Sequence, residues 1–417
     1  MGTHPGMVEL VLSRSNRLCA LGLITLALLL GCQPQRQGPL RQLRARALWP
    51  AELPSVIPAG VQHEAPFTAD PGLRPPRHIL ALSGGGLYGA YSTGFLAGWT
   101  QSRTRPEFDV VTGVSTGALA APFAFLGPEY DNRLEQLYTG VRAEDIFRIR
   151  TWVTIPFKDA VASSAPLMQL IESQVTPVVL ERIAEEHRKG RRLYVATTNL
   201  ETRRFVVWDM GAIACQNSPH ACRLFRDVLL ASASVPGMVP PVAFSMEVDG
   251  QSARQLHVDG GVTTPLFVPA AVFRAARTNT PEGQPVFPGA NGNLYVVVAG
   301  KLYPDASSVK PHVLPILGAT TEAIMYAHCR SELMSLYGQA QLAGLKYHLT
   351  ALRQDLLVQV TTPMSINQCV MTRLYTEGFK DGVAGPQWRS APPDMGPSEN
   401  DRVRMGLCDR PLVAHPR

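Results

Sequence analysis

The chain has 417 residues, enough for one large domain or two ordinary ones. Hydrophobic residues make up 45% of it and charged residues 17%, a balance that is typical of globular proteins and excludes a wholly disordered chain. The net charge of +6 is mild, and no basic run interleaved with aromatic residues indicates a nucleic-acid partner.

The first 31 residues have the pattern of a targeting segment. Two arginines precede an apolar run at 18–30, which suits a signal peptide better than a membrane span. The run ends in Gly31-Cys32, which resembles a bacterial lipobox, so we expect a signal peptide over 1–31 and lipidation of Cys32. An uncleaved anchor or an ordinary signal peptide stays open. Because Gln33 stands where aspartate is associated with inner-membrane retention, the pattern favours an outer-membrane lipoprotein of a bacterial cell envelope, facing the periplasm or the surface.

The rest of the chain divides into three parts. Residues 32–76 are rich in proline, glutamine and arginine, and we expect them to tether the anchor to the folded domain. Over 77–384 strands alternate with helices, which predicts a mostly parallel sheet covered by helices on both faces. Residues 385–417 are rich in proline, glycine and charge, and we expect a tail with little packing.

A serine lies in a sharp turn between a strand and a helix near the start of that domain. The apolar strand 108–111 runs into Gly113-Val114-Ser115-Thr116-Gly117, and an alanine-rich helix follows at once. Gly-x-Ser-x-Gly in this context is a nucleophile elbow, whose glycines let the backbone hold the serine hydroxyl above the sheet edge. Ser115 is therefore the candidate nucleophile.

A glycine loop precedes this elbow. The strand 79–82 leads into Ser83-Gly84-Gly85-Gly86, and a helix is expected over 91–101. Main-chain N–H groups without a neighbouring Cβ can approach a developing oxyanion closely, at the start of a helix whose dipole helps.

The same loop, with Gly89, also fits a dinucleotide-binding turn, which is a weak signal alone. That interpretation needs an acidic residue at the end of the second strand. Glu107 and Asp109 are near the required spacing, but they precede or open the strand, which disfavours a nucleotide site.

The later elements follow the alternating pattern. Helices are expected at 131–138, 165–188 with a break at Pro177, 224–233, 269–277, 319–342 and 371–379, and strands at 193–198, 204–208, 294–298, 346–352 and 356–360. Within this part, Asp259-Gly260-Gly261 ends a strand, a pattern that by itself most often marks a turn.

Cysteine spacing gives no metal site. Cys19 would leave with the signal peptide, and an odd number of cysteines remains after the lipobox, at 215, 222, 329, 369 and 408. In an oxidising compartment Cys215 and Cys222 could close a small loop, with at least one thiol left free. No cysteine or histidine cluster has zinc spacing, so no metal is expected.

Four separated blocks together resemble the patatin-like phospholipase family. They are the glycine loop, the Ser115 elbow, Asp259-Gly260-Gly261, and the stretch 231–241, which has an Ala-Ser-x-Ser-x-Pro pattern. The specific resemblance covers roughly 77–268. It implies a three-layer α/β/α fold that hydrolyses acyl esters of lipids, as a phospholipase A, lysophospholipase or esterase, without a cofactor.

The resemblance also implies residue roles. Ser115 would be the nucleophile, Asp259 its proton acceptor, and the amides of Gly84, Gly85 and Gly86 the oxyanion hole. The motif glycines would be Gly89, Gly113, Gly117, Gly260 and Gly261. Tyr88 departs from the family, which usually has Lys or Arg there, so an anchoring role for that cation is in doubt.

Two alternatives remain open. An ordinary α/β-hydrolase with a Ser-Asp-His triad needs a late histidine, for which the candidates are His312, His328, His348 and His415. His257 should point the same way as Asp259 and is expected to be a neighbour rather than a base. The other alternative is a surface lipoprotein that binds a lipid or a partner and has lost catalysis. The sequence does not predict an oligomeric state.

Overall fold

The computed structural model describes residues 56–59, 73–150, 158–248, 251–278, 289–305, 308–356 and 366–393. The expected signal peptide, Cys32 and most of the tether lie outside these ranges. So do Cys408, His415 and all but the first residue of the strand expected at 356–360.

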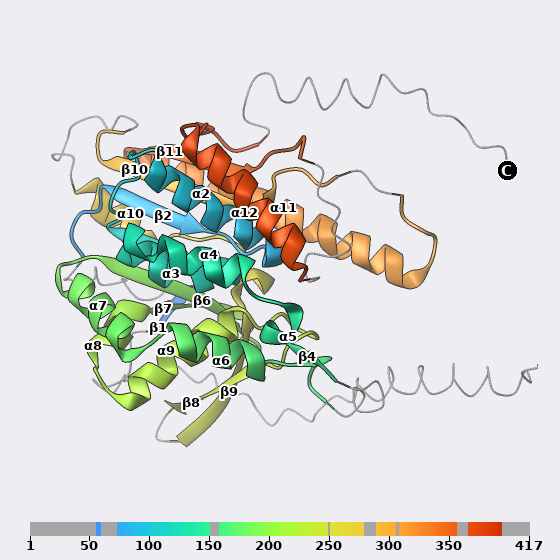
Figure 1. The fold of residues 1–417 in the computed structure, drawn as a ribbon. Helices are drawn as coiled ribbons and strands as arrows, with labels where there is room; N and C mark the ends of the chain where they lie inside the picture. The colour runs from blue at the N-terminus through green and yellow to red at the C-terminus, as the bar shows by residue number, and fades with distance from the viewer. Residues whose placement is uncertain are drawn as a thin grey trace, which may run out of the picture. The chain divides into compact units, whose positions relative to one another are not determined.

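The sheet has a parallel centre (Figure 1). Its strand order is β1-β7-β6-β3-β2-β10-β11, and neighbours from β6 to β11 run parallel. The parallel strands are β2 (His78–Leu82), β3 (Val110–Gly113), β6 (Arg192–Asn199), β10 (Gly292–Lys301) and β11 (Leu345–Leu352). Ser115 and the glycine loop therefore follow strands that share one carboxyl edge.

Four strands of the same sheet run antiparallel to their partners. They are β1 (Val56–Ala59), β7 (Arg204–Asp209), β8 (Val242–Val248) and β9 (Gln251–Asp259). β9 pairs with β6 in the register Thr197↔Asp259. Gly113 pairs with Val195, so Asp259 lies just past the carboxyl end of β3, although its own strand approaches from the opposite direction.

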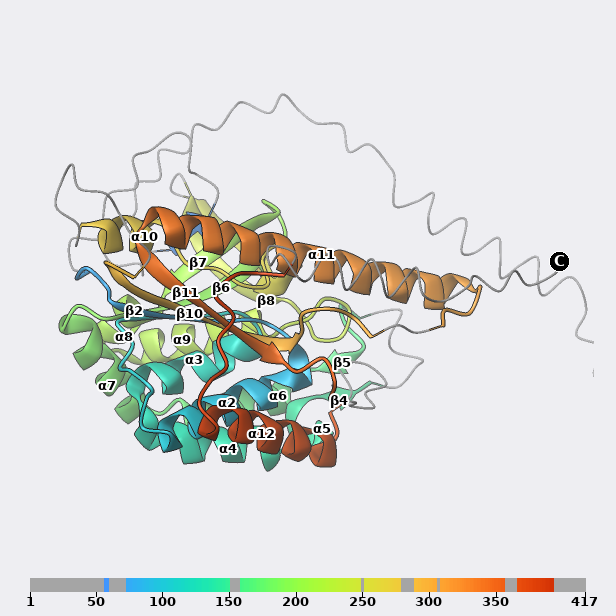
Figure 2. The ribbon, with the colours of Figure 1, turned by 90° about the horizontal axis from the view of Figure 1, so that it is seen from above.

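Helices cover both faces of the sheet, which confirms the predicted three-layer α/β/α fold (Figure 2). Ile79 and Ala81 pack into a core with α10 (Ala270–Arg277) and α11 (Val313–Leu342). Leu80 and Leu82 pack into the core of the other face. That face carries α2 (Gly89–Gln101), α3 (Thr116–Leu126), α4 (Asp131–Thr139), α6 (Ala165–Gln174), α7 (Pro177–Arg188), α8 (Met210–Cys215), α9 (Pro219–Ser232) and α12 (Gln368–Val383).

The short elements lie between these. They are the helix α5 (Ala143–Ile146), the strand pair β4 (Arg148–Ile149) and β5 (Ala162–Ser163), and the 3-10 turns η1 (Gly86–Tyr88), η2 (Pro128–Tyr130) and η4 (Gly260–Val262). Among the described residues, no helix combines the length and the apolar character needed to cross a bilayer.

Proline-based start signals explain where two of the helices begin. The segment expected at 165–188 is broken at Pro177 as predicted, because Thr176 caps a new helix with Pro177 in its first turn. The helix expected from 224 begins at Pro219, where the Ser218 hydroxyl accepts the Ala221 N–H at 3.1 Å. α11 also begins earlier than expected, at Val313 rather than 319.

The expectation of little packing after residue 384 needs a correction at its start. The Trp388 ring lies against Phe95, Trp99, Tyr295 and His348, with centroids 5.0–5.7 Å apart. Arg389 also forms a bridge with Leu349 of β11. A large aromatic side chain can close the open end of a core even when its neighbours in sequence are polar.

The described cysteines are unpaired, so the possible Cys215–Cys222 bridge is not formed. Cys215, Cys222, Cys329 and Cys369 are free thiols. Cys215 belongs to α8 and its thiol donates to the Ala184 carbonyl at 3.6 Å, while Cys222 belongs to the next helix. Both pack against the core as small apolar groups.

Candidate active site

Ser115 occupies a strained turn between β3 and α3. Its φ of 54° and ψ of −124° lie in a region that residues with a side chain rarely adopt. A Cβ on Gly113 would lie 2.5 Å from the Gly117 carbonyl oxygen, and one on Gly117 would lie 2.5 Å from that of Leu82. The two glycines are therefore required by close backbone contacts, and the turn between them is that of a nucleophile elbow.

A serine at the end of α9 holds this turn in place by hydrogen bonds. The Ser115 N–H donates to the Ser232 hydroxyl at 3.0 Å, and that hydroxyl donates to the Ala196 carbonyl of β6 at 2.7 Å. Ser232 is fully buried. Its hydroxyl thus joins the elbow to the neighbouring strand, which gives a role to the 231–241 block that sequence reasoning left without one.

The Asp259 carboxyl faces the elbow. It accepts a hydrogen bond from the Gly261 N–H at 2.7 Å, and the nearby Ser115 hydroxyl favours its charged form. The Asp259 main chain is fixed as well, since its N–H donates to the Ser234 carbonyl at 2.9 Å and its carbonyl accepts from Thr198 at 3.0 Å. The structure thus brings Ser115 and Asp259, far apart in sequence, close together at the end of β3.

Burial changes the acidity of this carboxyl. Asp259 is 5% exposed and Ser115 is 8% exposed. Desolvation raises the pKa of Asp259 from 3.8 to about 6, although the hydrogen bonds from Ser115 and Gly261 oppose the rise. A carboxyl with this pKa can both accept and return a proton near neutral pH.

The glycine loop lies against the same site, but not all of its main-chain N–H groups are free to bind an oxyanion. Gly84 packs on Ser115, with a hypothetical Cβ 3.2 Å from the serine Cβ, but its N–H donates to the Pro265 carbonyl at 3.0 Å. This bond removes Gly84 from the expected oxyanion donors. Within the described part of the chain, the N–H groups of Gly85 and Gly86 have no protein acceptor.

The backbone around the loop leaves no room for side chains. A Cβ on Gly85 would collide with the Ala299 carbonyl of β10, and Gly86 has a positive φ of 58°. The Ser83 hydroxyl accepts the Ala299 N–H at 2.8 Å, which ties the loop to β10. These contacts hold two unpaired amides at the partly exposed surface beside Ser115.

Comparison with known proteins agrees with this geometry. The model of the family described as "Patatin-like phospholipase" matches residues 80–272. This stretch is a patatin-like phospholipase domain. It contains the glycine loop, Ser115 and Asp259.

Two solved structures show a partial similarity to this chain at low sequence identity. One is VipD from Legionella pneumophila, at 11% identity and a TM-score of 0.36, with 74% of this chain and 67% of VipD covered. The other is the type III effector protein ExoU, at 12% identity and a TM-score of 0.30, with 75% of this chain covered. The chain spans only 53% of the length of ExoU. No curated protein sequence matches the chain.

The hydrogen bonds of the described His257 and His348 go to partners other than Ser115 and Asp259. His257 is buried between Trp208 and Phe244, and its Nδ1 lies 2.8 Å from the Thr197 hydroxyl. Desolvation lowers its pKa to about 4. Of the late candidates, His348 packs on Tyr295, His328 lies 3.6 Å from Glu332, and His312 is exposed before α11.

The nucleotide interpretation of the glycine loop is wrong, because the acidic residues lie at the other edge of the sheet. The Asp109 carboxylate accepts the N–H groups of Arg77 and His78, at the start of β2, each at 2.8 Å. Glu107 pairs with Arg191, which precedes β6. Neither carboxylate is near the carboxyl ends of the strands, where a ribose would lie.

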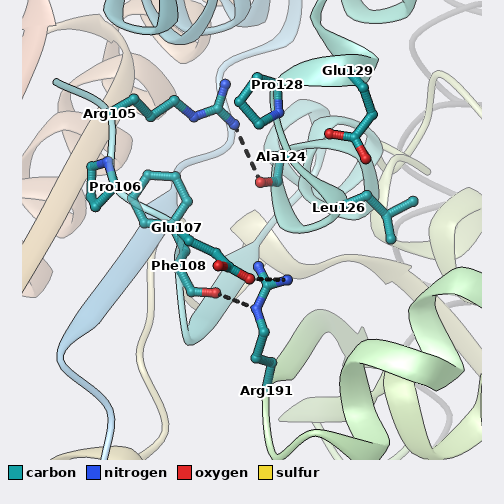
Figure 3. A pocket seen from close by; sticks show the side chains of 10 residues that line it. Arg105, Pro106, Glu107, Phe108, Ala124, Leu126, Pro128, Glu129 and Arg191 are labelled. Carbon is teal, nitrogen blue, oxygen red and sulfur yellow. Dashed lines mark hydrogen bonds and ion pairs between the residues drawn. The ribbon is translucent and has the colours of Figure 1, made fainter. Parts of the chain in front are cut away.

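A cavity of about 300 Å³ lies at that same amino edge, away from the patatin-like site (Figure 3). Arg105 and Arg191 line it, and both guanidinium groups are committed to protein partners. Arg105 donates to Asp131 at 2.8 Å and to the Ala124 carbonyl at 3.3 Å. Arg191 donates to the carbonyls of Phe108 and Phe125 at 2.8 and 2.6 Å. The cavity belongs to the structural framework of the domain.

Proposed function

We propose that this chain is a serine hydrolase of lipid acyl esters, with Ser115 as nucleophile and Asp259 as its base. The observation that carries the proposal is the position of the Ser115 hydroxyl beside the buried Asp259 carboxyl, whose pKa is raised to about 6. Serine needs a base to become a nucleophile at neutral pH, and the base must lie within hydrogen-bond reach. Asp259 meets both conditions without a histidine.

The reaction follows from these contacts. The Ser115 oxygen attacks the ester carbonyl carbon while its proton passes to Asp259. The carbonyl oxygen becomes an oxyanion, for which the free N–H groups of Gly85 and Gly86 are the proposed donors, each contributing roughly 3 to 4 kcal/mol by analogy with other serine hydrolases. Protonated Asp259 then gives its proton to the leaving alcohol, and an acyl group remains on Ser115.

The second half repeats the same proton transfers. Asp259, again unprotonated, takes a proton from water as the water attacks the acyl carbonyl, and the proton returns to Ser115 as the fatty acid leaves. Ser232 acts as a positioning residue, since it holds the Ser115 N–H and touches no reacting atom.

Substrate class is tested with the purified protein on defined esters. We expect release of fatty acid from phospholipid or lysophospholipid vesicles and turnover of short p-nitrophenyl esters, both abolished by a fluorophosphonate. Mass spectrometry of the released lipids measures which bond is cleaved. Binding to vesicles without any acyl release would contradict the proposal and favour a lipid-binding protein without catalysis.

A further inference from the structure

Ser83, the residue that precedes the glycine loop, is bound to β10 through both its main chain and its side chain. Its N–H donates to the Val297 carbonyl at 3.1 Å, and its hydroxyl accepts the Ala299 N–H at 2.8 Å. Ser83 is 2% exposed, so water does not compete for the hydroxyl. Both its position and its surroundings are therefore set by the sheet.

The one proton of the Ser83 hydroxyl goes to the glycine loop. A main-chain N–H can only donate, so the hydroxyl must be the acceptor toward Ala299. Its own proton is then free for the Gly84 carbonyl oxygen, which lies 2.8 Å away. The reaction proposed above assigns no role to this second bond.

The bond to the Gly84 carbonyl acts on the peptide unit that carries the Gly85 N–H. The carbonyl of one residue and the N–H of the next belong to one planar trans peptide, in which the two bonds point in opposite directions. A hydrogen bond that holds the Gly84 carbonyl therefore also sets the direction of the Gly85 N–H. It further polarises the peptide, which makes that N–H a stronger donor.

The loop needs such a restraint because glycine has the widest choice of φ and ψ. The next peptide unit is held in the same way, since the Gly85 carbonyl accepts the Tyr88 N–H at 3.2 Å and this unit carries the Gly86 N–H. Each free amide of the loop thus belongs to a peptide that is held by its carbonyl. A side chain does this only for the first of the two.

Attachment of the loop to β10 does not account for the Ser83 bond to Gly84. That attachment needs only the bonds to Val297 and Ala299, in which the hydroxyl is an acceptor. The donated bond stays within the loop and fixes the orientation of one peptide. This peptide lies beside the nucleophile, because a Cβ on Gly84 would be 3.2 Å from the Ser115 Cβ.

We propose that Ser83 is a positioning residue of the oxyanion hole, which holds the Gly84–Gly85 peptide so that the Gly85 N–H stays directed at the developing oxyanion. The proposal rests on the function proposed above and adds a residue that touches no reacting atom. It acts only through the peptide whose carbonyl it binds.

The test compares Ser83→Ala with the wild type, in the full chain, on p-nitrophenyl butyrate. Loss of a whole oxyanion donor lowers kcat by roughly 10² to 10³, and here the donor only loses its restraint, so we expect a fall of about tenfold to hundredfold. KM should stay within about twofold, because the oxyanion forms only on the way to the transition state.

Two further measurements separate positioning from a general effect on the fold. The pH profile of kcat/KM should keep its midpoint and show a lower plateau, because the variant leaves the Ser115–Asp259 pair in place. A trifluoromethyl ketone forms an adduct with the nucleophile that carries an oxyanion. Its inhibition constant should rise by the same factor as kcat/KM falls.

Three variants act as controls. Ser83→Cys keeps the side chain with a weak donor and should lose part of the activity, so it carries the test if Ser83→Ala does not fold. Ser83→Thr keeps the hydroxyl and should retain kcat within about fivefold. Ser92→Ala removes another buried serine, on α2, whose hydroxyl has no hydrogen-bond partner among the described residues, and should keep kcat within about twofold.

A kcat of Ser83→Ala within about twofold of the wild type would overturn the proposal. A shifted pH midpoint, or a rise in KM as large as the fall in kcat, would also do so, because Ser83 would then act on the base or on the shape of the site. A wild-type chain without Ser115-dependent turnover of the ester would contradict the proposed hydrolase function itself, and the role of Ser83 with it.

Discussion

Replacing Asp259 by asparagine is expected to lower kcat on a soluble ester by about a thousandfold, within the roughly 10² to 10⁴ range of general-base catalysis. Asparagine keeps the size of the side chain and can accept a hydrogen bond from Ser115, but it cannot take the proton. Ser115→Ala should be at least as inactive. Because the two side chains act as a unit, the double variant should be little worse than Ser115→Ala alone. Initial rates of p-nitrophenyl butyrate hydrolysis measure all three.

A carboxylate elsewhere on the supporting helix gives a matched control. Asp227 of α9 is partly buried and pairs with Arg223, and Asp227→Asn should keep activity within about twofold. Full activity in Asp259→Asn, combined with a dead histidine variant, would contradict the Ser-Asp pair and restore the triad alternative.

Activity should fall steeply as the pH drops below about 6. The base must be unprotonated to accept the Ser115 proton, and burial raises the pKa of Asp259 to about 6. Two pH units below that pKa only about one carboxyl in a hundred is charged, so kcat/KM near about pH 4 should be roughly hundredfold lower than at about pH 8. A pH profile of kcat/KM on a soluble ester measures this, and recovery of activity on return to neutral pH separates titration from unfolding.

The same pKa has a defined effect on stability. Because the folded state raises it, the stabilising contribution of protonated Asp259 is fully present below the unfolded value of 3.8 and is lost as the pH rises through about 6. The loss is on the order of 3 kcal/mol, from roughly two pKa units at about 1.4 kcal/mol each. Asp259→Asn removes the buried charge, so its thermal stability at about pH 8 should equal or exceed that of the wild type. A pH profile of kcat/KM that stays flat down to about pH 4 would contradict the role of Asp259 as the base.

The sequence predicted the parts of the site that depend on local backbone geometry. The turn at Ser115 needs glycines at 113 and 117 because of contacts with residues a few positions away or on the adjacent strand. Such requirements leave a recognisable pattern. The alternation of strands with helices over 77–384 likewise predicted a sheet covered on both faces, which the two cores confirm.

Contacts between segments far apart in the chain leave weaker patterns in the sequence than local backbone geometry does. The direction of β9, and the bond from the Gly84 N–H to Pro265, depend on how distant segments cross the sheet edge. The roles of Ser232 and Ser234 follow from the same crossing, since buried hydroxyls and carbonyls take whichever partner the fold brings near. The pattern of the 231–241 block marked these residues but not their partners.

Close helix packing was equally hard to foresee. Gly94 and Gly98 of α2 meet Gly378 and Gly382 of α12, and a Cβ on any of them would collide with the backbone of the other helix. In sequence these glycines only weaken two helices. The need for glycine at these four positions becomes clear only when both helices are seen packed together.

Identification of the residue that a fluorophosphonate modifies tests the central claim most directly. The account predicts a single modified residue, Ser115, in the wild-type protein analysed by peptide mass spectrometry. Labelling should be absent in Ser115→Ala and at least about a hundredfold slower in Asp259→Asn, because the probe reacts only with the activated hydroxyl. Modification of a different residue, or ester hydrolysis that persists in Ser115→Ala at the wild-type rate, would contradict it.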